Sequence, residues 1–260
     1  PTIAAVSKTP EAPLTLPDKP SIAVLPFNNM SGDPEQEYFS DGISEDIITA
    51  LSKFKWFFVT ARNSTFTYKG SAVDIKEVGR DLGVRYVLEG SVRKGGDRVR
   101  VTVQLIDATT GNHLWAERYD RQITDVFALQ DEITETVTAT IAPQLMVAEN
   151  ERVKGKPPES LAAWELVIRF QPLFWRMNHT DLLEAQKLLR GAIEHDPDYA
   201  QAHALLGFSY IWHAWMGWGD DPRSLIPKAE PEARRALELD DQEPWAYMAM
   251  SAVHGYARRH

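Results

Sequence analysis

The chain has 260 residues, enough for two ordinary domains, and its 43% hydrophobic and 25% charged residues are typical of a globular protein. A net charge of −9 argues against a general binder of nucleic acid or anionic membranes, because such proteins need a basic face. The absence of cysteine excludes disulfides, thiol catalysis and cysteine-ligated zinc, and no apolar run approaches the ~20 residues of a membrane span.

Residues 1–20 are rich in proline and begin with neither a methionine nor a signal-peptide pattern. Proline-rich segments are extended, so this stretch is predicted to be a linker from a preceding segment. The chain ends at "AYMAMSAVHGYARRH", inside a helical pattern without a C-cap signal. We therefore expect these residues to be an excised part of a longer protein.

Residues 21–83 predict two strand–helix pairs. The run "SIAVLPF" predicts a short strand, and apolar residues at helical spacing over 35–54, with carboxylates in the first turns, predict a helix. The run "WFFVTARNS" predicts a second strand. The run "DIKEVGRDLG" predicts a short helix that ends at Gly83 in a left-handed C-cap.

Residues 84–149 predict an antiparallel meander and a long helix. Three segments of alternating polarity are separated by "KGGD" and "TTGN", which are hairpin signals. Apolar residues then recur every four positions, so a helix over 124–149 is expected to lie on the sheet, with Pro143 kinking or fraying its end. The predicted interior contact joins Val99, Val101, Val103 and Leu105 of the sheet to Leu129, Ile133 and Val137 of this helix. The order βαβαβββα predicts a small α/β sandwich with a mixed sheet over 21–150.

From residue 159 onward the pattern is helical and repeats. The stretch "EAQKLLRGAIEHDPDYAQAHALL" returns 44 residues later as "KAEPEARRALELDDQEPWAYMAM", so that Ala185 and Ala192 recur as Ala229 and Ala236. Small residues at fixed helix positions let helices approach closely, which is typical of helical arrays. The predicted fold class is therefore α+β, with an all-α repeat domain over 159–260 after the α/β sandwich.

The stretch 21–51 has the strand–loop–helix order of a nucleotide-binding unit, which raises the question of a phosphate site. Its loop "NNMSGDPEQE" offers only Gly32 and adds acidic residues that would repel phosphate, and the chain contains neither GxxxxGK[ST] nor GxGxxG. We therefore predict a helix cap here. The carboxylates at 33–46 lack the spacing of a calcium loop, and His195, His203 and His213 lack a metal-ligand spacing. No catalytic, cofactor-binding or metal-binding residue is predicted.

Most of the tryptophans fall in the repeat block, where they are expected to fill the core between helices. Trp215 and Trp218 are exceptions, because they lie beside glycines in the segment "WMGWGDDPRS" that is inserted between two predicted helices. Exposed loop aromatics are candidates for recognition. The alternative is that both pack onto the neighbouring helix.

The stretch "PDKPSIAVLPFNNMSGDPEQEYFSDGISEDIITALSK", with "LGVRYVLEGSVRKGGDRVRVTVQLIDATTGNHLWAERYDR" and "FALQDEI", resembles the region downstream of the catalytic domain in bacterial class III adenylate/guanylate cyclases that carry tetratricopeptide repeats. The same region also occurs behind winged-helix regulators, and its first part is similar to the amino-terminal domain of TolB. The resemblance implies an α/β domain followed by tetratricopeptide repeats. It brings no cyclase residues, because the catalytic domain would lie upstream of Pro1.

In such repeats the concave surface comes mainly from the first helix of each pair. The resemblance, aligned through Leu206, Gly207 and Tyr210, implies a partner-binding side whose residues, with the two loop aromatics, are Glu165, Arg169, Gln201, Phe208, Trp212, Trp215 and Trp218. The spacing agrees, because Gln201, Ala204, Phe208 and Trp212 follow three- and four-residue steps and so share one helix face. The alternative is that the loop at 214–223 covers Phe208 and Trp212.

The sequence thus predicts a non-catalytic regulatory and protein-interaction segment of a bacterial adenylate/guanylate cyclase-like signalling protein. Its expected partner is a protein or peptide, with no nucleic acid, no cofactor and no direct membrane insertion, and a homo-oligomer is also allowed. The alternative is a sensor whose α/β domain binds a nucleotide or metabolite, and a hydrolase or metal enzyme is disfavoured. The expected compartment is cytoplasmic, or periplasmic if an upstream membrane anchor exists.

Overall fold

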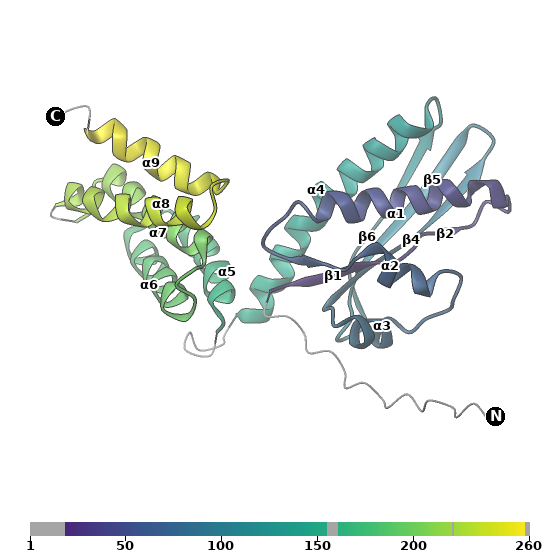
Figure 1. Ribbon diagram of the computed structural model, residues 1–260, viewed down its shortest axis with the longest axis horizontal. Coiled ribbons are helices and arrows are strands. Elements are labelled where there is room, and N and C mark those ends of the chain that lie inside the picture. The colour runs from purple at the N-terminus through teal and green to yellow at the C-terminus, as the bar shows by residue number, and fades with distance from the viewer. Residues whose placement is uncertain (1–18, 155–160, 220, 258–260) are drawn as a thin grey trace, which may run out of the picture. The chain divides into compact units, whose positions relative to one another are not determined.

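The computed structural model describes residues 19–154, 161–219 and 221–257 and divides into two compact units, Pro1–Ala148 and Glu149–His260 (Figure 1). The predicted linker over 1–20 lies almost wholly outside the described residues. No helix within the described part of the chain is both long enough and apolar enough to cross a membrane.

The first unit is an α/β sandwich on a six-stranded mixed sheet, as the sequence predicts. Parallel pairing joins β1 to β3 and to β4, and antiparallel pairing joins β4, β5 and β6 in the predicted meander. The strand order is β3-β1-β4-β5-β6, with β2 also paired to β4. The elements in chain order are β1 (Ser21–Val24), β2 (Asn28–Asn29), η1 (Pro34–Gln36), α1 (Glu37–Leu51), β3 (Phe58–Val59), α2 (Arg62–Thr65), η2 (Phe66–Tyr68), α3 (Ile75–Leu82), β4 (Tyr86–Gly95), β5 (Arg98–Asp107), β6 (Asn112–Gln122) and α4 (Val126–Val153).

Three details of this unit differ from the sequence prediction. The strand expected over "WFFVTARNS" is limited to β3, because the chain turns into α2 after only two residues pair with β1. Strand β2 has no apolar pattern and forms because the backbone after β1 continues beside β4. Helix α4 continues past the predicted end at residue 149 to Val153, and Pro143 lies inside it at an exposed position.

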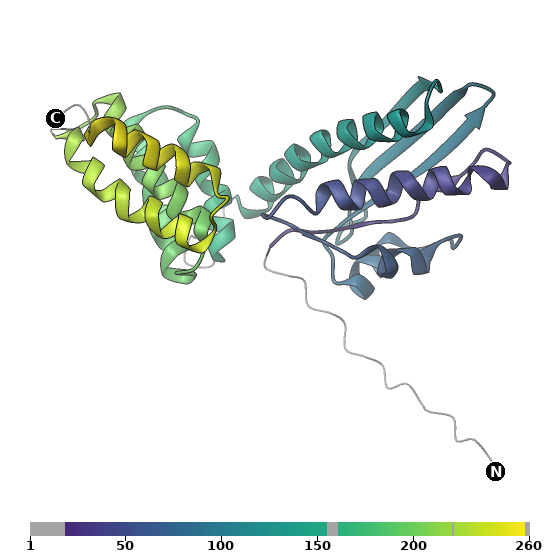
Figure 2. The ribbon, with the colours of Figure 1, turned by 45° about the horizontal axis from the view of Figure 1, so that its top comes forward.

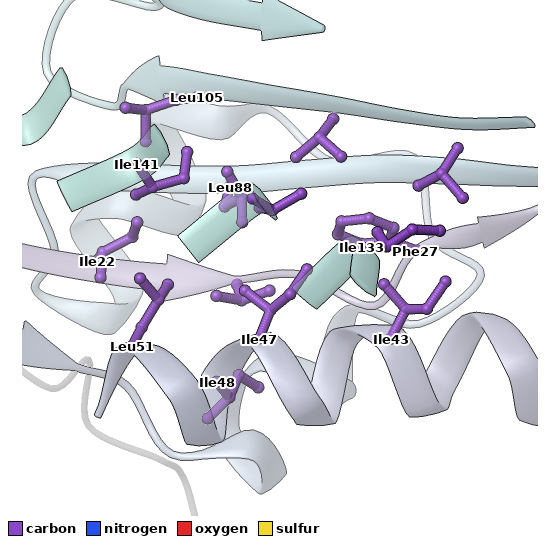
Figure 3. Close-up of a cluster of buried hydrophobic side chains, with 14 of the residues drawn as sticks. Ile22, Phe27, Ile43, Ile47, Ile48, Leu51, Leu88, Leu105, Ile133 and Ile141 are labelled. Atoms are coloured by element: carbon purple, nitrogen blue, oxygen red, sulfur yellow. The ribbon is translucent and has the colours of Figure 1, made fainter. Parts of the chain in front are cut away.

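One face of the sheet is covered by α1 and α4, which lie along the same side of it in Figures 1 and 2. Figure 3 shows Ile43, Ile47 and Leu51 of α1 pointing toward the sheet residues Ile22 and Leu88, with α4 side chains entering the same cluster. The predicted interior contact is confirmed, because this one cluster holds Val99, Val101, Val103, Leu105, Leu129, Ile133 and Val137.

The other face of the sheet is covered only in part. Helix α3 begins at the N-cap Asp74 and ends at Gly83, which is left-handed (φ 63°) as predicted. It packs against Val87 of β4 and Ala108 just after β5, and no Cβ fits at Gly79, because it would lie 2.6 Å from the Ala108 methyl carbon. Beyond Val87 the outward residues of β4, β5 and β6 are half-buried or exposed.

The second unit is entirely helical in its described residues. Its elements are α5 (Ala163–Phe174), α6 (His179–His195), α7 (Ala200–Met216), η4 (Pro222–Leu225), α8 (Ile226–Leu239) and α9 (Pro244–Ala257). The sequence repeat appears as α6 followed by α7 and again as α8 followed by α9. Asp196 and Asp240 end α6 and α8 in the same way, each donating its backbone N–H to an alanine carbonyl, that of Ala192 or of Ala236.

The repeated alanines are the contact points between these helices. The alanines at 185, 192, 202, 229, 236 and 246 are all fully buried. Gly207 of α7 allows a close approach to α8, since a Cβ there would lie 3.1 Å from the Ala229 carbonyl oxygen. Helix α7 extends further than predicted, to its left-handed C-cap Gly217, so Trp215 lies on its last turn rather than in the inserted loop.

Candidate partner-binding surface

The loop before α1 caps the short turn η1, whereas the N-cap of α1 itself, Gln36, makes no side-chain capping bond. Asp33 Oδ1 accepts the backbone N–H of Glu35 at 3.0 Å and so caps η1. Asn29 Oδ1 accepts the N–H of Ser31 at 2.9 Å, and Ser31 Oγ accepts the N–H of Lys94 at 2.9 Å. The loop's polar groups therefore serve the backbone of the loop itself and of the adjoining strand.

The acidic start of α1 is partly neutralised by cations from the following segments. Lys69 Nζ lies 2.9 Å from Glu37 Oε1 and 2.6 Å from Asp41 Oδ2, and Arg62 Nε lies 2.9 Å from Glu45 Oε2. The bond to Lys69 lowers the pKa of Glu37 below its ordinary value. Among the described residues, no group of three or more His, Asp or Glu is arranged to hold a metal ion.

Glu165, one of the predicted partner-binding residues, is buried and committed to the unit's own structure. Its Oε2 accepts the N–H of Ala162 at 2.9 Å, which caps α5. Its Oε1 lies 2.7 Å from Nη2 of Arg152, which also pairs with the fully buried Glu149. Glu165 therefore joins α5 to the end of α4 and does not face solvent.

The other predicted residues of the partner-binding side are half-buried or buried. Arg169 of α5 and Gln201 of α7 are both half-buried, and Gln201 Oε1 accepts the Tyr199 hydroxyl at 3.0 Å. Ala204 is fully buried and packs in a cluster with Ala236 and Ala246, on the side of α7 that faces α8 and α9.

Phe208 is the centre of an aromatic cluster formed by three helices. It is buried, and its ring centroid lies 5.0 Å from that of Trp245 on α9 and 6.0 Å from that of Phe174 on α5. Trp212 is half-buried, 5.7 Å from Phe174, and Trp215 meets Phe208 edge-on at 6.5 Å. We call these residues, together with Phe170 and Trp175, the aromatic surface of α5, α7 and α9.

A cavity of about 100 Å³ opens in this surface. Its lining residues are Phe170, Gln171, Phe174, Trp175, Leu205, Phe208 and Trp245. The phenylalanines and Leu205 are buried and form its inner wall, whereas Trp175 is 60% exposed at its edge. The sequence predicts Trp175 to lie in the core between helices, and this is wrong, because Trp175 stands at the C-cap of α5, where its side chain is exposed.

Trp215 and Trp218 belong to different places. Trp215 is half-exposed and contacts Phe208 and Trp212, so it extends the aromatic surface. Trp218, in the loop after α7, packs instead on His179 of α6 and His213 of α7, at ring distances of 5.7 and 6.2 Å. Burial, and then the nearby His179, lower the pKa of His213 below its ordinary value. Trp218 therefore packs onto neighbouring helices, which is the alternative to a role in recognition.

A larger open cleft of about 490 Å³ lies along α6. Its polar lining comes from that one helix, and only Leu166 reaches it from α5. A small-ligand site normally has polar groups converging from several elements. This cleft lacks that convergence.

The family comparison matches the first unit. Residues 18–136 match the family model described as "HilA/YgeH-like transcriptional regulator, second domain". The match extends from just before β1 to the middle of α4 and so covers the sheet with both of its helix layers.

The sequence comparison covers both units. The chain is 45% identical over 249 residues to "Putative adenylate cyclase 3" from Rhizobium meliloti (strain 1021). That alignment includes 96% of this chain but 42% of the relative. The chain therefore spans less than half the length of the curated relative it matches.

Solved structures resemble about half of the chain. The lipoprotein GNA1162 from Neisseria meningitidis is 23% identical and covers 47% of this chain and 96% of its own, with a TM-score of 0.36. TolB from Acinetobacter baumannii is 21% identical and covers 52% of this chain and 30% of its own, also with a TM-score of 0.36. The C-terminal domain of LpoB from Salmonella enterica is 18% identical over 42% of this chain and 85% of its own, with a TM-score of 0.33. By sequence, then, the chain is similar over its first unit to the second domain of HilA/YgeH-like regulators and over nearly all its length to part of a protein named as an adenylate cyclase.

Proposed function

We propose that this chain is a non-catalytic regulatory and protein-interaction segment of a bacterial adenylate/guanylate cyclase-like signalling protein, and that its helical unit binds a protein or peptide partner. The similarity to part of a protein named as an adenylate cyclase supports the signalling context. The similarity of the first unit to the second domain of transcriptional regulators supports an accessory rather than a catalytic role.

The observation that carries the proposal is the cavity in the aromatic surface of α5, α7 and α9. Its inner wall is apolar, and its edge is an exposed tryptophan. A volume of about 100 Å³ is of the order of one large apolar side chain, since an engineered cavity of roughly 150 Å³ accepts benzene. Tryptophan-edged apolar pockets are where interfaces concentrate their binding energy.

The order of the helices supports the same function. In a tetratricopeptide arrangement, α5 with α6 and α7 with α8 are successive pairs, and α5, α7 and α9 are the first helices that line the concave side. The cavity is lined by residues of those three helices and by the α5 C-cap. We infer that Phe208 forms the inner wall of the binding cavity, while Trp175 and Trp215 meet the partner.

The partner should present an apolar anchor side chain from an extended or helical segment. Gln171 is the polar side chain of the cavity lining, and its amide can both donate and accept hydrogen bonds. It is thus suited to a backbone group beside the anchor. Specificity would come from the fit of the anchor and from this one polar contact.

We expect a displayed library of random peptides, selected on the purified chain, to enrich sequences that share one large apolar residue. Trp175→Ala should weaken binding of a selected peptide at least tenfold, measured by calorimetry, because it removes one wall of the cavity. Phe127→Ala is the matched control, since Phe127 is 75% exposed on α4, outside the helical unit, and should leave the affinity unchanged. Selection without an apolar consensus, or binding that Trp175→Ala leaves intact, would contradict the proposal.

A further inference from the structure

The outer face of the β4–β6 meander carries a group of arginines. This face is the one that α3 leaves uncovered, and its arginines are all exposed: Arg93, Arg98, Arg100 and Arg118. The remaining outward residues are Glu89, Ser91, Thr102, Gln104, Ala116, Asp120 and Gln122. The face is therefore basic on a chain whose net charge is −9. We call it the arginine face.

The arginine face is only partly neutralised by its own carboxylates. Arg93 and Arg100 are directly opposite each other across β4 and β5, an arrangement of like charges that destabilises a strand pair. Arg100 and Arg118 share the single carboxylate of Asp120, at 2.6 and 3.3 Å. Among the described residues Arg93 has no hydrogen-bonding or ion-pair partner. Cationic groups in this arrangement attract carboxylates from another surface.

The opposite side of the same unit carries the complementary charge. Asp46 on α1 and Asp131 and Glu135 on α4 lie on the outward sides of the two helices that cover the sheet. None of the three has an ion-pair partner in the part of the chain that the structure describes. Burial, followed by the charges of Asp131 and Glu45, raises the pKa of Asp46 above its ordinary value. Negative charge is therefore crowded here, and we call this the acidic helix face.

We propose that the arginine face of one copy binds the acidic helix face of a second copy of this chain. The two faces lie on opposite sides of one sandwich, so the contact is head-to-tail and unlike surfaces meet. This contact would place arginines of one copy beside carboxylates of the next and so reduce the repulsion between like charges on both faces.

Single-stranded nucleic acid fits the arginine face less well. Proteins that bind such strands without sequence preference offer aromatic rings on which bases stack, and the outward residues of this face include no aromatic side chain. The acidic helix face of a second copy, by contrast, is always present at the same concentration as the arginine face.

The test uses the whole chain and two double variants. In the first, Arg93→Glu and Arg98→Glu reverse the arginine face, and the new Glu at 93 opposes Arg100 favourably. In the second, Asp131→Lys and Glu135→Lys reverse the acidic helix face, and the new Lys at 131 offsets Asp46. Circular dichroism checks that both fold, and sedimentation velocity measures mass.

We expect the unmodified chain to associate at about 0.01 M salt and to dissociate at about 1 M, where the Debye length falls from ~30 to ~3 Å. Each double variant alone should associate at least tenfold more weakly. An equimolar mixture should associate again, because the intact arginine face of the second variant meets the intact acidic helix face of the first, and the two reversed faces are also opposite in charge.

Three results would overturn the proposal. The unmodified chain could stay monomeric at low salt, or the mixture could stay monomeric while the unmodified chain associates. The second variant could also associate as strongly as the unmodified chain, which would assign the arginine face to a different acidic surface. Binding of the arginine face to an oligonucleotide, with no self-association, would favour nucleic acid instead.

Discussion

His203 lies buried between α7 and α8, and both of its ring nitrogens are engaged. Nδ1 is 2.6 Å from Glu232 Oε2, and Nε2 is 3.0 Å from the Pro197 carbonyl oxygen. Both partners are acceptors, so the ring satisfies them together only when it is protonated on both nitrogens. The hydrogen bond to Glu232 raises the pKa of His203 above its ordinary value, although burial opposes this.

This raised pKa predicts a pH dependence of stability. A histidine whose pKa is higher in the folded chain contributes stability that is full below its unfolded value of about 6.5 and is lost as pH rises through the folded value. We therefore expect the urea midpoint of the helical unit, followed by tryptophan fluorescence, to fall between pH 6.5 and 9. His203→Gln should reduce that fall, and His195→Gln, at an exposed position, should not.

His213 does not contribute to the change in stability expected between pH 6.5 and 9. The pKa of His213 is lowered, so its contribution changes only as pH drops below about 6.5, where the unfolded chain becomes protonated. An equal fall in midpoint for the unmodified chain and for His203→Gln would show that the contact with Glu232 contributes no pH-dependent stability.

At the scale of elements, the alternation of apolar and polar residues along the strands decides which side chains of the meander face the helices. Val101 is fully buried against the helices, and the next residue, Thr102, is half-buried on the arginine face. A one-residue shift in register would exchange these two sides. The two positions therefore form a matched pair for testing the register.

Val101→Asp should destabilise the first unit by several kcal/mol, because it buries an unpaired charge. Thr102→Asp should change stability by less than about 1 kcal/mol, since its side chain faces water opposite Arg118. Thermal denaturation followed by far-ultraviolet circular dichroism distinguishes them. A lower melting temperature for Thr102→Asp than for Val101→Asp would mean that the strand faces are assigned in reverse.

At the scale of the whole molecule, the two units have separate cores. Each exceeds 100 residues, the size at which a domain usually has a core of its own. In the first unit the loop that most resembles a phosphate site is a cap, and in the second the conspicuous cavity is apolar. Under the proposed function, neither unit is catalytic.

The purified chain, incubated with ATP or GTP and manganese, should therefore yield no cyclic nucleotide above a protein-free blank. A cyclase assayed in parallel provides the positive control. Cyclic product that increases in proportion to the amount of chain would show that the chain itself is catalytic and would refute the non-catalytic part of the proposed function.

Much of the fold follows from local pattern in the sequence. Alternation predicts the meander, four-residue spacing predicts α4, and Gly83 predicts the end of α3, because each signal depends on neighbours within a few residues. The repeat of Ala185 at Ala229 likewise predicts paired helices, since close packing requires a small side chain wherever it recurs. Strand β2 has no such signal and forms only because the backbone lies beside β4.

The candidate surface was less predictable, because exposure depends on which distant elements meet. Helical spacing places Phe208 on the same face of α7 as Trp212. Its ring is buried only because Phe174 of α5 and Trp245 of α9 pack against it. Glu165 resembles a surface carboxylate until Arg152, at the end of α4, pairs with it. The sequence alone therefore determined the elements and their polar and apolar sides, whereas only the tertiary structure decided which aromatic side chains face a partner, because burial is set by contacts between elements far apart in the chain.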